Sequence, residues 1–163
     1  MWIQTDNQQV EQLFDGQSYL QSGFLRPVCV RISRVLQQML LRGYMPRVNA
    51  RPLVEWDPRE YNGLADNAAN LALDRGEDWT FVSAERVLQA KSEPVNYRLC
   101  FDGAKRGTGS SAAGVALLAY YFDGRRDLLF RGGKLLGKLD SAMVAECLAL
   151  EWSLDLFKRV VWT

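Results

Sequence analysis

The stretch Leu99-Cys100-Phe101-Asp102-Gly103-Ala104 places a carboxylate directly after three apolar residues and directly before a glycine. This pattern predicts a strand that ends at Asp102, whose side chain would emerge at the strand end beside flexible backbone. Turn residues at Gly107 to Ser111 and at Asp123-Gly124 divide the following sequence into two more strands. We therefore expect an antiparallel meander made of Tyr97 to Phe101, Ala113 to Phe122 and Asp127 to Gly132.

A second carboxylate, Glu146, lies in the long helix predicted after the meander. Asp140-Ser141 is a helix-start signal, and the helix, which runs through Phe157, is apolar nearly all round, as expected of a helix buried against a sheet. An unpaired buried acid costs on the order of several kcal/mol, and no lysine or arginine lies between Ser141 and Leu156. A metal ion is therefore a natural partner for Glu146.

The first half of the chain carries two more acids in comparable positions. Trp2 to Thr5 predicts a strand that leads into Asp6, and the alanine-rich stretch Asn62 to Asp74 predicts a helix with Asp66 in its first turns. Asp6 could equally be a helix N-cap, and Asp66 an ordinary partner of the helix dipole. The other elements expected in this half are a helix after Asp6, a helix from Pro27 to Gly43 and a strand at Leu53 to Trp56.

Residues 77–96 form a polar stretch that differs in composition from both halves, and we interpret it as a linker with a short helix at Ser83 to Lys91. At the other end of the chain, Val160 to Thr163 is similar to Trp2 to Thr5 and predicts one more strand. The chain therefore looks cut inside a repeated element.

The composition excludes several classes of chemistry. The chain has 163 residues, a formal net charge of +1 and no histidine, so a Ser-His-Asp triad, a Cys-His pair and a His-ligated metal site are excluded. Three cysteines without CxxC spacing indicate neither a disulfide framework nor a zinc knuckle, which favours a reducing, intracellular compartment. No apolar run is long enough to span a membrane. The length suits a single domain, 1–163.

Two groups of motifs resemble ribonuclease H. The segment around Asp102, the hairpin Ala112 to Phe122 and the run Ala145-Glu146-Cys-Leu-Ala-Leu resemble the first three strands and first helix of that family. Trp2-Ile-Gln-Thr-Asp6-Asn-Gln-Gln-Val looks like its fourth strand, with the third catalytic acid. Trp56-Asp-Pro-Arg-Glu-Tyr-Asn62-Gly-Leu-Ala-Asp66-Asn-Ala-Ala-Asn is similar to the last-helix motif of the retroelement and plant type.

The order of these motifs differs from that of the family, because the stretches around Asp6 and Asp66 precede those around Asp102 and Glu146. The resemblance implies a circularly permuted ribonuclease H-like α/β fold, with a mixed five-stranded sheet and helices on both faces, that starts at the family's fourth strand. Residues 1–76 would be the family's C-terminal half, 77–96 the linker and 97–163 its N-terminal half. A natural permutation, an excerpt from tandem domains and a deliberate rearrangement all explain this order.

The resemblance also implies an activity: hydrolysis of the RNA strand of RNA/DNA hybrids by a two-metal-ion mechanism. Asp102, Glu146, Asp6 and Asp66 would be the catalytic residues and the ligands of two Mg²⁺ ions, with Mn²⁺ as a substitute. Many family members carry a histidine in the loop before the last helix, where this chain has Asp57 to Tyr61. Arg59 and Glu60 are candidates for its role.

Hybrid recognition requires contacts to phosphates and to 2′-hydroxyl groups. The candidate nucleic-acid-binding residues are Arg31, Arg34 and Arg42 along the second predicted helix, Lys105 and Arg106 after Asp102, and Asn7 and Gln8 after Asp6. Arg47 and Arg51 extend the arginine group, which resembles the family's basic handle in position. A solvated helix flank explains the same arginines without any ligand.

Other functions fit parts of the pattern. A catalytically weak or inactive fold that binds hybrid or duplex is the main alternative, and an integrase or transposase shares the acid chemistry but lacks the Asn62-x-x-Ala65-Asp66 motif. For assembly we expect a monomer or a dimer that exchanges strands, because a strand at Val160 to Thr163 would leave an exposed edge.

Overall fold

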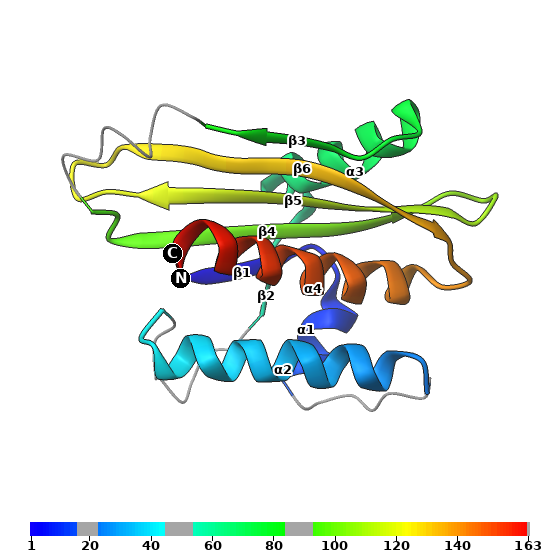
Figure 1. The fold of residues 1–163 in the computed structure, drawn as a ribbon, viewed down its shortest axis with the longest axis horizontal. Helices are drawn as coiled ribbons and strands as arrows, with labels where there is room; N and C mark the ends of the chain where they lie inside the picture. Colours follow the sequence, from blue (N-terminus) through cyan, green and yellow to red (C-terminus); the bar gives the residue numbers. More distant parts are fainter. Residues whose placement is uncertain (16–22, 45–53, 84–92, 163) are drawn as a thin grey trace.

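A six-stranded mixed sheet forms the centre of the molecule, with the strand order β2-β1-β4-β5-β6-β3 (Figure 1). The computed structural model describes residues 1–15, 23–44, 54–83 and 93–162. Strand β1 is parallel to β2 and β4, whereas the pairs β4–β5, β5–β6 and β6–β3 are antiparallel. The strands are β1 (Trp2–Thr5), β2 (Glu55–Trp56), β3 (Trp79–Val82), β4 (Asn96–Lys105), β5 (Ser110–Tyr120) and β6 (Arg126–Lys138).

Helices cover both faces of this sheet, which confirms the α/β class (Figure 1). They are α1 (Gln8–Phe14), α2 (Leu25–Leu41), α3 (Gly63–Arg75) and α4 (Ala142–Val161), with a short 3₁₀ helix, η1, at Arg59–Tyr61. Gly103 on β4 faces α4, whereas Gly114 on β5, the register partner of Asp102, faces α3. Successive residues of a strand point to opposite faces, so α3 and α4 lie on opposite sides of the sheet.

The larger core lies on the α4 side, where α2 also packs. Leu99 and Phe101 of β4 pack there with Ile32 of α2 and with Leu150 and Phe157 of α4, and all five are at most 1% exposed. The α3 side is built from small residues instead, because the buried residues of α3 are Ala65, Ala68, Ala69 and Ala72.

Glycines let both helices approach the sheet to backbone contact. A Cβ at Gly103 would lie 2.3 Å from the backbone nitrogen of Glu146, and one at Gly114 would lie 1.9 Å from the carbonyl oxygen of Ala65. Gly133 meets α3 in the same way, 2.2 Å from the carbonyl oxygen of Ala68. No other residue fits at these contacts without a shift of the backbone.

Most of the elements expected from sequence are present. The meander β4–β5–β6 is confirmed, and the Ser141 hydroxyl caps α4 by accepting a hydrogen bond from the Met143 amide. Helix α3 ends at Gly76, which has a φ of 68°, and α2 begins at Leu25, two residues before Pro27.

The sheet has six strands rather than the expected five. The additional strand, β3, lies inside the stretch that we interpreted as a linker, and Trp79 to Val82 pairs antiparallel with Gly133 to Phe130 of β6. Sequence periodicity missed β3 because it is a short edge strand, exposed along most of its length. The short helix expected at Ser83 to Lys91 lies outside the described residues.

The strand expected at Val160 to Thr163 is wrong. Val160 and Val161 are the last residues of α4, and Trp162 is its C-cap in a right-handed helical conformation. Trp162 stacks on Tyr44 at a ring-centroid distance of 6.0 Å, and the Arg42 guanidinium lies 4.3 Å from the Trp162 ring centroid. Packing of this aromatic against the α2 end overrides the local β propensity, and the exposed strand edge behind the expected exchanged dimer is not present.

The two ends of the described chain lie side by side (Figure 1). The Met1 amino group donates a hydrogen bond to the carbonyl oxygen of Tyr44, whose ring stacks on Trp162. Among the helices of the described residues, none combines the length and hydropathy required to cross a membrane.

Candidate metal centre

The candidate site lies where β1 ends and its neighbour β4 continues. β1 pairs with β4 from Trp2–Arg98 to Gln4–Cys100, whereas β4 runs on to Lys105. Asp102 therefore lies inside β4 and not at a strand end, which corrects the sequence prediction. What ends near Asp102 is the neighbouring strand, so the β1 side of β4 is left open to side chains at this point.

Beyond the end of β1, two side chains form hydrogen bonds with the backbone of β4. The side-chain amide of Asn62 donates a hydrogen bond of 2.9 Å to the Phe101 carbonyl. The backbone amide of Gly103 donates one of 3.1 Å to Glu146 Oε2. Buried backbone groups are nearly always paired, and here Asn62 and Glu146 supply the partners in place of a strand. The same bonds bring both side chains next to Asp102.

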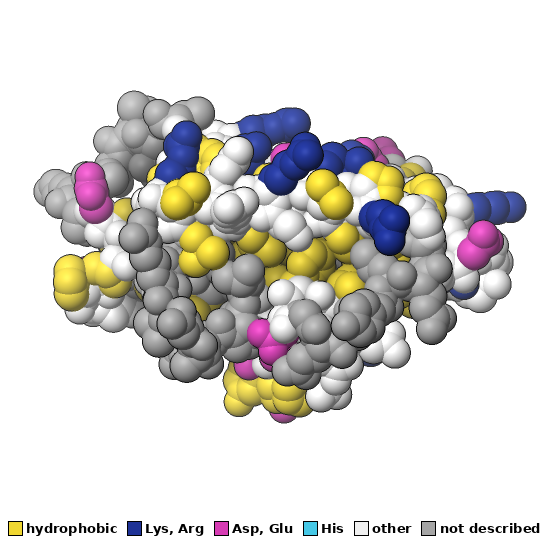
Figure 2. Space-filling view, turned by 90° about the horizontal axis from the view of Figure 1, so that it is seen from below, with side chains coloured by type: hydrophobic (Ala, Val, Ile, Leu, Met, Phe, Trp, Pro, Cys, Tyr) yellow, Lys and Arg dark blue, Asp and Glu magenta, His cyan; other side chains and the backbone are white. Residues whose placement is uncertain are grey.

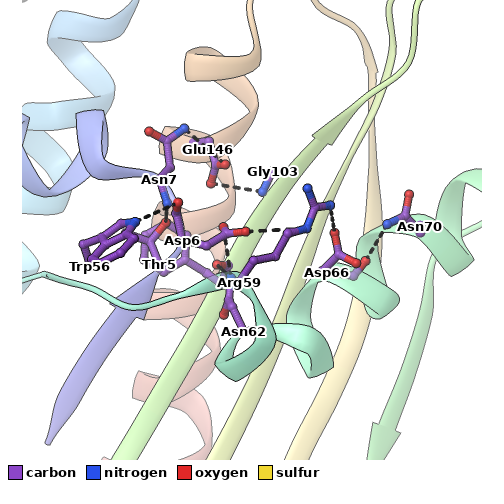
Figure 3. A network of polar contacts seen from close by, with 11 residues as sticks. Thr5, Asp6, Asn7, Trp56, Arg59, Asn62, Asp66, Asn70, Gly103 and Glu146 are labelled. Atoms are coloured by element: carbon purple, nitrogen blue, oxygen red, sulfur yellow. Dashed lines mark hydrogen bonds and ion pairs between the residues drawn. The ribbon is translucent and has the colours of Figure 1, made fainter.

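Three acids from separate parts of the chain meet at this edge, and Figure 3 shows two of them, Asp6 and Glu146. Asp6 follows β1, Asp102 lies on β4 and Glu146 lies on α4, and one carboxylate oxygen of each falls within 4.8 Å of those of the other two. Asp102 is 6% exposed and Glu146 5%, whereas Asp6 is half-buried. Asp6 is not the helix N-cap, because Asn7 caps α1 by accepting a hydrogen bond from the Gln9 amide.

Within this acidic cluster, Asp6, Asp102 and Glu146, the two buried acids Asp102 and Glu146 have raised pKa values. Burial, and then the negative charges of Asp6 and Asp66, raise the pKa of Asp102 to about 7. Burial, and then the charge of Asp102, raise the pKa of Glu146 to about 8, although hydrogen bonds from Asn7 and Gly103 oppose this shift. Crowded carboxylates in a low-dielectric site cannot all ionise unless a cation joins them.

The fourth predicted acid, Asp66, lies near the cluster but is bound to an arginine. Arg59 of η1 donates a hydrogen bond of 2.6 Å from Nη2 to Asp66 Oδ1, and its Nε lies 3.9 Å from Asp6 Oδ2. Figure 3 shows the Arg59 side chain reaching from Asp6 to Asp66. The structure therefore brings three of the four predicted acids together directly and links the fourth to them through Arg59.

Asn62 contributes more to the site than its sequence position indicated. Its side chain is 1% exposed and donates hydrogen bonds to the Phe101 carbonyl and, at 3.4 Å, to Asp6 Oδ1. The Trp56 indole adds a hydrogen bond of 3.1 Å to the backbone carbonyl of Asp6. The sequence indicated both residues only as members of the last-helix motif, without a role at the site. Their role in fixing Asp6 depends on the pairing of β1 with β2, the strand that leads into η1, which no local pattern encodes.

Of the residues near the acids that were expected to bind nucleic acid, three line the candidate site and one forms an ion pair outside it. Asn7, Gln8 and Lys105 line a pocket of about 540 Å³ together with the acidic cluster. The Asn7 amide donates a hydrogen bond of 3.3 Å to Glu146 Oε1, so Asn7 orients an acid in this structure. Arg106 forms an ion pair with Asp74 of α3.

The arginines expected to form a basic surface are exposed on α2. Arg31 forms an ion pair with Glu151 of α4, Arg42 lies over the Trp162 ring, and Arg34 lines a groove between α2 and α4. Figure 2 shows Lys and Arg side chains gathered along one long edge of the face seen from below. Arg47 and Arg51, which extended this group in sequence, lie outside the described residues.

The donor set of the cluster consists of carboxylates, with no histidine or cysteine among its members. Oxygen-only donors suit hard cations such as Mg²⁺ and Mn²⁺, and the raised pKa values of Asp102 and Glu146 reflect burial and the neighbouring carboxylates, which a bound cation would offset. The acidic cluster therefore fits a divalent ion. Comparisons with protein-family models, curated proteins and solved structures found no significant match to this chain.

Proposed function

We propose that this protein is a metal-dependent nuclease of the ribonuclease H type that hydrolyses the RNA strand of RNA/DNA hybrids. The observation that carries the proposal is the convergence of Asp6, Asp102 and Glu146 within 4.8 Å at one sheet edge. The sequence resemblance gave these acids as parts of one site, although 96 residues separate Asp6 from Asp102.

The permuted order is part of the proposal. The strands that resemble the family's first three are β4, β5 and β6, and β1, which resembles its fourth, pairs with β4. The adjacency of Met1, Tyr44 and Trp162 supports a cyclic relation between the two halves, because the two described ends meet in space. This geometry is compatible with each of the three origins of the order considered above.

In this proposal the acids hold divalent ions, and the ions supply Lewis-acid stabilisation and a bound water of lowered pKa. The protein's own contribution is to fix the ligands before substrate arrives. The Gly103 amide and the Asn7 side chain orient Glu146, while Asn62 and Trp56 hold Asp6. Ligands positioned by such contacts lose little freedom when a metal or substrate binds.

The substrate would lie over the pocket and extend along α2. Lys105 and Gln8, which line the pocket, would meet the strand that is cut, and Arg31, Arg34 and Arg42 would offer charge for phosphates further along. The 11 residue-to-residue steps from Arg31 to Arg42 correspond to about 16 Å of helix, a length that spans several phosphates of one strand. Glu151 and Asp155 offset part of this charge in the groove between α2 and α4.

The test is cleavage of a labelled RNA/DNA hybrid in Mg²⁺ by wild-type protein and by Asp102→Asn. We expect the variant to lose cleavage and to keep or raise the melting temperature, because the amide removes a buried carboxyl with a pKa of about 7. Glu77→Gln, which changes an exposed acid outside the pocket, is the matched control and should cleave like wild type. Full activity in Asp102→Asn would contradict the proposal.

The engagement of Asp66 by Arg59 favours one second candidate, a fold that binds the hybrid without cutting it. In that case one of the four acids is committed to a structural ion pair. This candidate would replace the first if purified protein shifted a hybrid in a gel but gave no product across titrations of Mg²⁺ and Mn²⁺.

A further inference from the structure

Arg59 divides the candidate metal centre into two unequal parts. On one side are the three acids of the cluster, whose oxygens already lie within reach of a common ion. On the other side, Asp66 Oδ1 accepts a hydrogen bond of 2.6 Å from Arg59, and the same guanidinium lies 3.9 Å from Asp6. The space between Asp66 and Asp6 is therefore taken by a cation of the protein itself, and a second divalent ion held by Asp66 would have to displace it.

The negative charges around Arg59 stabilise its guanidinium cation at this position. The hydrogen bond to Asp66 and the charges of Asp66, Asp6 and Asp102 all raise the pKa of Arg59. Among the described residues that line the pocket, the cations are Arg59 and Lys105, and the acids are Asp6, Asp66, Asp102 and Glu146. Within this lining, Arg59 is the cation for which ion pairs with the acids are found.

The backbone that carries Arg59 is held by buried contacts, whereas its side chain is largely exposed and is held by its ion pairs with the acids. The Asp57 amide donates to the Thr5 carbonyl at 2.8 Å, the Asp57 carboxylate pairs with Arg98 at 3.1 Å, and the Asn62 side chain is buried. The Arg59 side chain, by contrast, is 73% exposed. It can therefore leave the acids by rotating into solvent, without disturbing η1 or α3.

We propose that Arg59 is a built-in counter-cation that competes with the second divalent ion for Asp66 and Asp6. The first ion enters the acidic cluster directly, whereas binding of the second requires that the guanidinium leave. Two cations cannot share one carboxylate pair at close range without strong repulsion, so each lowers the affinity for the other. This inference rests on the proposed function, whose metal centre it assumes.

The experiment measures Mn²⁺ binding by isothermal titration calorimetry on wild-type protein and on Arg59→Gln, without nucleic acid. Removal of the competing charge should tighten the weaker of two Mn²⁺ binding events about three- to tenfold, the scale set by an exposed ion pair with two acids. The stronger event should change less, because the cluster is formed without Arg59. Circular dichroism and thermal unfolding of both proteins establish that the variant is folded.

Two control variants separate the position of Arg59 from its charge. Arg75→Gln removes an equal charge from the exposed end of α3, about 13 Å of helix beyond Asp66, and should leave both binding events unchanged. Arg59→Lys keeps the charge but not the planar donor fork, and should fall between wild type and Arg59→Gln.

The titrations distinguish a failure of the proposed role of Arg59 from a failure of the metal centre itself. If wild-type protein binds Mn²⁺ but Arg59→Gln gives the same or weaker affinity for the weaker event, the role of Arg59 is overturned and the metal centre stands. If wild type binds no Mn²⁺, and Arg59→Gln binds none, the metal centre of the proposed function is overturned together with the inference.

Discussion

The two faces of the sheet deliver their acids to the site in different ways. Glu146 arrives on α4, whose backbone touches Gly103. The residue is 5% exposed, and its carboxylate accepts hydrogen bonds from the Gly103 amide and the Asn7 side chain. Asp66 arrives on α3, which approaches the sheet just as closely at Gly114, but its side chain is 20% exposed and is held by Arg59 alone among the described side chains.

The contrast shows that close packing of a helix does not by itself fix a functional side chain. What fixes Glu146 is a pair of hydrogen bonds, one from the Gly103 backbone amide of the sheet and one from the Asn7 side chain, which also caps α1. What holds Asp66 is one long side chain with 73% of its surface in solvent. We call these the rigid half and the adjustable half of the site.

The largest expected change in stability comes from disrupting the rigid half of the site. Gly103→Ala places a Cβ 2.3 Å from the Glu146 backbone nitrogen, so α4 has to move away from β4, and we expect the free energy of unfolding to fall by about 3 kcal/mol or more. Urea denaturation followed by circular dichroism measures the loss. Gly63→Ala, where a Cβ meets nothing within 4 Å, is the control. An unchanged urea midpoint for Gly103→Ala would show that α4 can shift at little cost.

The next effect, the pH dependence of stability in the presence of a chelator, reports on the buried acids. In the folded state the pKa values of Asp102 and Glu146 rise from 3.8 to about 7 and from 4.5 to about 8. The folded state therefore binds more protons than the unfolded state between pH 4 and 8, so stability falls as the pH rises through this window and levels off above pH 8. The expected loss is several kcal/mol, because each tenfold change in proton affinity corresponds to about 1.4 kcal/mol.

Urea titrations at pH 5 and pH 9 measure this slope, and Glu146→Gln should reduce it because one of the two groups is removed. Mg²⁺ should restore stability at pH 9 by binding the ionised acids. Equal slopes for wild type and Glu146→Gln would mean that Glu146 is better solvated than its burial indicates.

The smallest expected change in stability comes from a substitution in the adjustable half of the site. Asp66→Asn removes the ion pair with Arg59, and because the Arg59 side chain is 73% exposed we expect the unfolding free energy to change by less than about 1 kcal/mol. The measurement is the same urea titration at pH 7. A loss above about 2 kcal/mol would mean that the Arg59–Asp66 pair holds α3 in place, and the distinction between the two halves would no longer apply.

Much of the fold could be predicted because its signals are local. Apolar periodicity, Ser141 as a cap and Gly76 as a helix end predicted α4 and α3, and turn residues predicted the meander. The exceptions are elements whose state depends on distant partners. Strand β3 depends on the edge of β6, and the end of α4 depends on the contact between Trp162 and Tyr44.

The candidate site was predictable to a similar degree. Glu146 could be singled out because an acid on an apolar helix without a nearby cation needs a partner, and a motif resemblance grouped it with Asp6, Asp66 and Asp102. No sequence pattern indicated that β1 ends opposite Cys100 and leaves the edge of β4 to Asn62 and Glu146.

The sequence by itself determined the types of group available: carboxylates, among them the four candidate site acids, arginines along one helix, and no histidine. These limits follow from composition and from local spacing, because donor chemistry and helix periodicity are properties of neighbouring residues. Only the tertiary structure decided which acids meet. Asp6, Asp102 and Glu146 come together because β1 ends early and Gly103 admits α4, whereas Asp66 is bound by Arg59. Contacts of this kind depend on how distant segments pack, and packing is a property of the whole fold.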